Sequence, residues 1–208
     1  MNRNLKTGDI LLCGSGPRES WPFSWFSYLI KLYTHSPYSH VAMILVDPSF
    51  IHPALKGTFV WESSNGSVPD PQDNKKKLGV RITPLADFLN AYQVQGGRVV
   101  VRPIHCPPDT FNPERLETIH DIVYGKPYDL NLKDWLSALL PLPLDEHSNP
   151  TVTRFWCSAL VGYIYTKCGL LDPFTNWSFL RPSDFSVESE NLNFVSDIAS
   201  LGIEQKIL

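Results

Sequence analysis

The 208-residue sequence lacks several features that mark common classes of protein. Its two richest apolar windows, Trp21–Tyr33 and Trp135–Leu144, are shorter than the ~18 residues that span a bilayer, and Ser, Lys or Pro interrupts each of them. It also lacks a charge excess, since 18 basic and 21 acidic residues leave a net charge of −3. These absences predict no transmembrane helix and no general nucleic-acid binding.

Paired cysteines are absent as well. Cys13, Cys106, Cys157 and Cys168 form no CxxC pair, which argues against a zinc ribbon. The N-terminus shows no apolar segment followed by a small-residue cleavage site, so we expect free thiols in an intracellular, reducing compartment. The Gly14–Pro17 loop lacks the Lys-Ser/Thr of a phosphate-binding loop. We therefore expect neither a metal nor a nucleotide cofactor.

The residues that are present suffice for one sizeable core. Hydrophobic residues make up 43% of the chain, and the chain is shorter than the ~250 residues at which cores divide. Strands are predicted at Asp9–Cys13, His40–Val46, Thr58–Ser63, Val80–Thr83 and Arg98–Ile104, and helices at Trp21–Tyr33, from Thr83-Pro84 to about Tyr92, from Asn112-Pro113 to Gly125 and at Phe155–Cys168. Their irregular order favours an α+β fold. We expect one domain over residues 1–208, with insertions near 65–78 and 130–153.

Cys157 is the first candidate for chemistry, because it falls at the start of the predicted C-terminal helix. A thiol in a first helical turn faces unpaired N–H groups and the positive end of the helix dipole, and both stabilise the thiolate. The same N–H groups can hold a developing oxyanion. The structural alternative is a small buried hydrophobic residue, which is what most free cysteines are.

A nucleophilic cysteine needs a base, and His40 begins a predicted strand directly after a turn. Glu62 lies near the end of the next strand. If these strands form a hairpin, His40 and Glu62 become cross-strand neighbours, ~5–8 Å apart between Cβ atoms, and the carboxylate can orient the imidazole. The structural alternatives are a capping histidine and a solvated strand end.

The order of these motifs resembles the circularly permuted papain-like cysteine hydrolases of the NlpC type, which include bacterial proteins, relatives in large DNA viruses and the lecithin retinol acyltransferase group. The motifs are Gly8-Asp9-Ile10-Leu11, Ser39-His40-Val41, Glu62, Cys157-Ser158-Ala159-Leu160-Val161 and Arg181-Pro182-Ser183-Asp184-Phe185. In the unpermuted family the cysteine helix comes first, whereas here His and the acidic residue precede it. The resemblance covers residues 5–187 and implies a permuted papain-like fold, a small antiparallel sheet or half-barrel packed against helices.

The resemblance also implies roles. Cys157 would be the nucleophile, His40 its general base and Glu62 the residue that orients His40. Asp9 matches the early Gly-Asp signature and is expected to be structural. The candidate substrate-binding residues are Tyr128, Trp156, Ser39 and Ser158, of which Tyr128 matches an aromatic position upstream of the cysteine helix. No metal is implied.

Three functions follow from the resemblance and stay open at this stage. The first is a cysteine hydrolase or acyltransferase that acts on a lipid acyl, ester or amide bond through a thioester intermediate. The second is a peptide or isopeptide amidase, and the third is a catalytically silent structural or binding module. The apolar windows Trp21–Tyr33 and Trp135–Leu144 flank the predicted site in sequence and suggest an acyl-chain groove or a contact with a membrane surface, while the favoured alternative is that both windows belong to the core. The cytoplasm is the expected location, or a virion if the source is viral.

Overall fold

The computed structural model describes residues 4–18, 23–51, 53–66, 68–129, 152–189, 191–195 and 199–208, without the side chains of residues 23–26. The strands are β1 (Ile10–Gly14), β2 (His40–Val46), β3 (Thr58–Ser64), β4 (Gly79–Pro84), β5 (Arg98–Arg102), β6 (Ile104–His105), β7 (Ser200–Leu201) and β8 (Gln205–Lys206); the helices are α1 (Phe23–Thr34), α2 (Leu85–Gln95), α3 (Pro113–Val123) and α5 (Cys157–Lys167), with short 3₁₀ turns η1 (Trp177–Phe179) and η2 (Pro182–Phe185). The predicted α+β class is confirmed.

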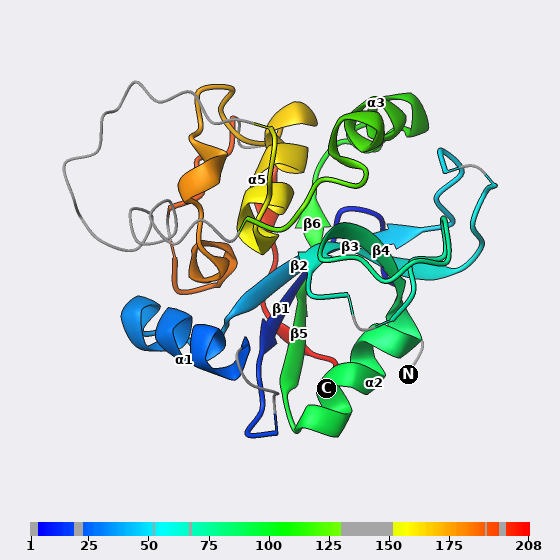
Figure 1. Ribbon diagram of the computed structural model, residues 1–208. Coiled ribbons are helices and arrows are strands. Elements are labelled where there is room, and N and C mark those ends of the chain that lie inside the picture. Colours follow the sequence, from blue (N-terminus) through cyan, green and yellow to red (C-terminus); the bar gives the residue numbers. More distant parts are fainter. Residues whose placement is uncertain are drawn as a thin grey trace.

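Six of the strands form one open antiparallel sheet in the order β4-β3-β2-β1-β5-β8. Figure 1 shows α5 on one side of this sheet and α2 on the other. The β2–β3 hairpin that the sequence predicts is present, with Met43 opposite Trp61. A separate two-stranded ladder joins β6 to β7.

Alternation along the strands divides the core into two layers. Leu11, Cys13, Ala42 and Ile44 face Phe88 of α2, while the residues between them in sequence face α5. Every residue of α5 from Cys157 to Tyr165 is buried, as expected for a helix enclosed on all sides. Because full burial of one aliphatic side chain contributes about 1.5–3 kcal/mol, these layers fix the position of α5 against β2 and β3.

Some predicted element ends are wrong by a few residues, each for a local reason. The predicted strand 98–104 is interrupted at Pro103, which has no N–H to donate to a ladder. The C-terminal helix starts at Cys157 and not at Phe155, because Phe155 pairs as an isolated bridge with Tyr128. Thr83 is not a helix cap: it belongs to β4, and Pro84 is the N-cap of α2.

Other helix signals are confirmed. The Asn112 side chain accepts a hydrogen bond from the N–H of Arg115 at the start of α3. Gly169 follows α5 with φ 74°, and the N–H groups of Gly169 and Leu170 donate to Thr166 and Tyr165 in a Schellman pattern.

Two apolar windows of the sequence have different outcomes. The described part of the first window, from residue 23 on, lies in α1, where Tyr28 and Leu32 are 58% and 57% exposed. The second, Trp135–Leu144, lies outside the described residues, as does most of the predicted insertion at 130–153. No helix among the described residues is long and apolar enough to cross a membrane.

Candidate active site

Cys157 is the first residue of α5, so it lies in the first turn of the helix, as the sequence predicts. The preceding Trp156 is extended (φ −85°, ψ 173°), so the chain turns into the helix at the thiol itself. Against the effect of burial, the neighbouring His40 side chain and the backbone N–H groups of Val41 and Ser158 lower the pKa of the Cys157 thiol. The residue is only 4% exposed. The thiol therefore lies where N–H dipoles converge, at the edge of the core.

His40 and Glu62 meet across the β2–β3 hairpin. Continuing the observed register places Ala42 opposite Glu62, so His40 is its diagonal neighbour on the same face of the sheet. The side chains span this offset, with His40 Nε2 2.9 Å from Glu62 Oε2. Since Nε2 is held by the carboxylate, Nδ1 is the ring nitrogen left to serve the Cys157 thiol. The predicted pairing of His40 with Glu62 is confirmed at hydrogen-bond distance.

The charges of these three groups support one another. Burial raises the pKa of the Cys157 thiol, but the neighbouring His40 imidazolium and the donated N–H bonds outweigh burial and lower the pKa below its ordinary value. Burial lowers the pKa of His40, yet the Cys157 thiolate and Glu62 together raise it to about 10. The favoured state is a thiolate–imidazolium pair backed by a carboxylate.

The other cysteines have different surroundings. Burial raises the pKa of the Cys13 thiol well above its ordinary value and raises that of Cys168 to about 12. Cys13 lies in β1 and Cys168 is the C-cap of α5, so neither lies at a helix N-terminus. All four cysteines are free thiols. Position in the fold, and not residue type, distinguishes Cys157 from Cys13 and Cys168.

Sequence reasoning missed two buried residues beside Glu62. Thr83 Oγ1 donates to Glu62 Oε1 at 2.7 Å, and the Arg81 Nε is 3.1 Å from Thr83 Oγ1 and 3.9 Å from Glu62 Oε1. Burial alone raises the pKa of Glu62, but His40, Thr83 and Arg81 lower it below its ordinary value. The alternation of β4 was the signal for both, since Arg81 and Thr83 share one face of that strand.

The four candidate substrate-binding residues differ in their surroundings. Burial raises the pKa of the Tyr128 phenol, and the negative charge of the Cys157 thiolate raises it further. Trp156 and Ser39 are buried next to Cys157 and His40 in sequence. The Ser158 hydroxyl donates to the Leu180 carbonyl at 2.6 Å, so this side chain already has a partner in the core. Tyr128 alone of the four is half-buried.

Two further contacts fix the start of α5. Phe155 bridges to Tyr128, and its carbonyl accepts a hydrogen bond from the Ser63 hydroxyl of β3 at 2.6 Å. The cysteine helix is thus tied directly to the strand that carries Glu62.

Asp9, expected to be structural, accepts N–H bonds from Lys6 and Ile104 through its two carboxylate oxygens.

Comparisons with known proteins give a likeness of fold. No family model matches the chain, and no curated protein matches it significantly. Among solved structures, the chain is similar to the crystal structure of metalloprotein yiiX from Escherichia coli O157:H7, described as DUF1105. The TM-score is 0.53 at 20% identity, over 98% of this chain and 99% of that one. In the part of this chain that the structure describes, no group of three or more His, Cys, Asp or Glu residues is placed to hold a metal ion.

Proposed function

We propose that the protein is a cysteine-dependent hydrolase or acyltransferase with Cys157 as nucleophile, His40 as general base and Glu62 as the residue that orients His40. One observation carries the proposal: a thiol at a helix N-terminus has its pKa lowered by a neighbouring histidine, and Nε2 of that histidine lies 2.9 Å from a buried carboxylate. This combination supplies a nucleophile, a proton carrier and an orienting group in one constellation.

The reaction begins with the Cys157 thiolate attacking a carbonyl carbon. The carbonyl π electrons move to oxygen and give an oxyanion. The backbone N–H groups of the first turn of α5, which begins at Cys157, can stabilise this oxyanion by hydrogen bonding. Collapse of the tetrahedral intermediate breaks the bond to the leaving group, which takes the proton held by His40. A thioester on Cys157 remains. Water, or an acceptor in the case of a transferase, gives its proton to His40 as it attacks, and the thiolate is released.

The permuted order of His40, Glu62 and Cys157 supports a place among papain-like NlpC-type hydrolases. For the substrate we propose a lipid acyl, ester or amide bond, and Tyr28 and Leu32 on the exposed face of α1 favour an apolar partner such as a lipid surface. A peptide or isopeptide bond is the alternative. The proposal uses no metal, because the chain supplies both nucleophile and base.

Thiol alkylation across pH tests the catalytic proposal without a known substrate. Iodoacetamide labelling, with each cysteine followed by mass spectrometry, should show Cys157 reacting well below about pH 8 while Cys13 and Cys168 stay inert. His40→Ala should move the Cys157 inflection to higher pH, because it removes the imidazolium. His105→Ala, which removes an exposed imidazole elsewhere, is the matched control. Inert Cys157 in the folded wild-type protein contradicts the enzyme and favours a silent module.

The substrate class is tested with chloromethyl ketone probes that carry either a long acyl chain or a short peptide. Preferential labelling of Cys157 by the acyl probe is expected, and Cys157→Ser should abolish it. Preference for the peptide probe would replace the lipid proposal with the amidase.

A further inference from the structure

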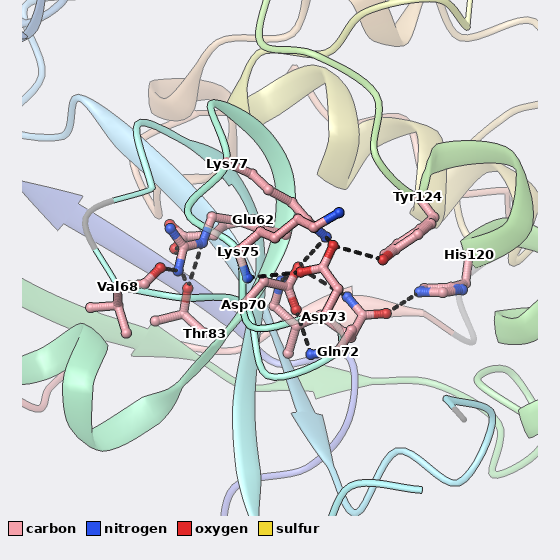
Figure 2. Close-up of polar contacts among 12 residues, drawn as sticks. Glu62, Val68, Asp70, Gln72, Asp73, Lys75, Lys77, Thr83, His120 and Tyr124 are labelled. Atoms are coloured by element: carbon pink, nitrogen blue, oxygen red, sulfur yellow. Dashed lines mark hydrogen bonds and ion pairs between the residues drawn. The ribbon is translucent and has the colours of Figure 1, made fainter. Parts of the chain in front are cut away.

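Glu62 is held on both of its carboxylate oxygens. Oε2 faces His40, and Oε1 accepts the hydroxyl proton of Thr83 at 2.7 Å. Figure 2 shows Thr83 next to Glu62 within a larger group of polar contacts. Glu62 and Thr83 are 5% and 3% exposed, so water does not compete strongly for these bonds.

Arg81 sets the direction of the Thr83 hydroxyl. Its guanidinium can only donate, and its Nε lies 3.1 Å from Thr83 Oγ1. Thr83 has a single hydroxyl proton and accepts from Arg81, so that proton goes to Glu62. Glu62 is then an acceptor on both oxygens, and His40 must present Nε2–H to it. In neutral His40 this chain of donors leaves the lone pair of Nδ1 to take the proton of the Cys157 thiol, which forms the thiolate–imidazolium pair.

The segment between β3 and β4 contacts the Arg81 guanidinium. Arg81 Nη2 donates to the Val68 carbonyl. In Figure 2 the same segment is fastened by Lys77, whose Nζ lies 2.9 Å from Asp70 Oδ2 and 3.0 Å from Asp73 Oδ2. Tyr124 of the turn after α3 also donates to Asp73. The sequence predicts this segment to be an insertion. In the structure it binds Arg81, which contacts Thr83 next to Glu62.

We propose that Thr83 and Arg81 are positioning residues that fix the Nε2–H tautomer of His40 through Glu62, and that the segment 68–77 holds Arg81 for this role. The inference rests on the proposed function and adds to it the groups that set the basicity of Nδ1. Neither residue touches the thiol. Both act through Glu62.

Thr83→Val tests the inference, because it keeps the shape of the side chain and removes the hydroxyl. Glu62 loses a donor, its pKa rises, and it stabilises the imidazolium less. We expect the alkylation inflection of Cys157 to move up by about one pH unit, which lowers the labelling rate at about pH 6 roughly tenfold. Thr83→Ser restores the hydroxyl and should restore the wild-type profile. Thr58→Val, on β3, is the matched control.

A second measurement reads the tautomer of His40 directly, with Thr83 and Arg81 unchanged. The ring ¹⁵N shifts of neutral His40, obtained by NMR in Cys157→Ser, should show Nε2 protonated and Nδ1 bare. Nδ1 protonation there overturns the inference even if Thr83→Val does not fold. Arg81→Lys should move the Cys157 inflection in the same direction as Thr83→Val, since one ammonium group cannot reach both Thr83 and the Val68 carbonyl in the guanidinium geometry.

The outcomes separate the two proposals. Failure of Cys157 to react below about pH 8 in the wild-type protein removes the proposed function and this inference with it. A low wild-type inflection that stays in place in folded Thr83→Val leaves the function standing and overturns the inference alone. A shift that Thr83→Ser does not reverse also overturns it, because the hydroxyl is then not the cause.

Discussion

At the residue scale, the site depends on a balance between burial and hydrogen bonding. Burial opposes the charge on Cys157, His40 and Glu62 alike, and the hydrogen bonds and charges around them favour the ionised forms. His40 depends on both Cys157 and Glu62, while Cys157 depends on His40 and on backbone N–H groups. Glu62 depends on His40, Thr83 and Arg81. Burial raises the pKa of the Cys13 thiol on β1, and the negative charges of Glu62 and Cys157 raise it further, although the Tyr92 side chain opposes the rise.

This dependence predicts a bell-shaped pH profile for hydrolysis of an activated ester such as a p-nitrophenyl ester. The rate should fall on the acid side as the Cys157 thiolate is protonated, at a pH below the ordinary thiol pKa. It should fall on the alkaline side as the His40 imidazolium loses its proton, near pH 10. Both limbs belong to the coupled pair.

Glu62→Gln should narrow the pH range over which the ester is hydrolysed. Without the carboxylate, the His40 pKa falls and the Cys157 pKa rises, so the alkaline limb moves down and the acid limb moves up. Glu188→Gln removes the same charge from an exposed position and should leave both limbs unchanged. Limbs that stay in place in Glu62→Gln would contradict the assigned role of the carboxylate.

At the element scale, the start of α5 depends on a seam between β4 and the chain after α3. The N–H of Val80 donates to Lys126, and the N–H of Tyr128 donates to Leu78. Gly79 lies in the seam with φ 140°, and a Cβ there would be 2.3 Å from the Lys126 carbonyl oxygen. Tyr128 in turn pairs with Phe155 in an isolated β-bridge, and Phe155 lies two residues before Cys157. The contacts of β4 with the chain after α3 therefore help to position the start of α5.

Gly79→Ala should therefore be strongly destabilising, by about 2–5 kcal/mol, because it adds a backbone clash to an unfavourable φ. Gly57→Ala is the matched control: its φ is 110°, but the nearest atom to its Cβ is 4.0 Å away. It should cost about 1–3 kcal/mol from the backbone alone. Urea unfolding measures both, and equal losses would show that the close approach at Gly79 has no energetic weight.

At the scale of the whole molecule, one side chain joins the sheet to the C-terminal part of the chain. Arg102, at the end of β5, donates to the carbonyls of Gly202, Phe185 and Leu201 at 2.8, 2.8 and 3.1 Å. These partners lie 83 to 100 residues further along the chain. Arg102 is buried, and burial lowers its pKa. The guanidinium fork satisfies three carbonyl acceptors at once, of which the bond to Phe185 is buried and the other two are partly buried.

Arg102→Lys should lower the free energy of unfolding by about 2–4 kcal/mol, since an ammonium group cannot reach all three carbonyls and leaves buried acceptors unpaired. The same change at the exposed Arg18 should stay within about 0.5 kcal/mol. Urea or thermal unfolding decides between them. A stability equal to wild type in Arg102→Lys would mean that the tail is held by its strands alone.

The sequence by itself determined the class of the fold, the position of Cys157 at a helix N-terminus and the pairing of His40 with Glu62. These follow from local rules: apolar periodicity, helix-terminal residues and the geometry of a hairpin between two neighbouring strands. Such signals are contained in a few consecutive residues, which is why β2 is predicted with its observed bounds. Ends shift where another segment intervenes, as at Phe155.

Only the tertiary structure decided which residues stand behind Glu62 and which thiol is activated. Thr83 has the sequence signature of a helix cap, yet it donates to Glu62 because β4 pairs with β3. The opposite pKa shifts of Cys13 and Cys157 depend on charges and N–H groups brought together from distant parts of the chain. Burial and electrostatic interaction act through space, and the contacts that set them exist only once the sheet and α5 have packed together.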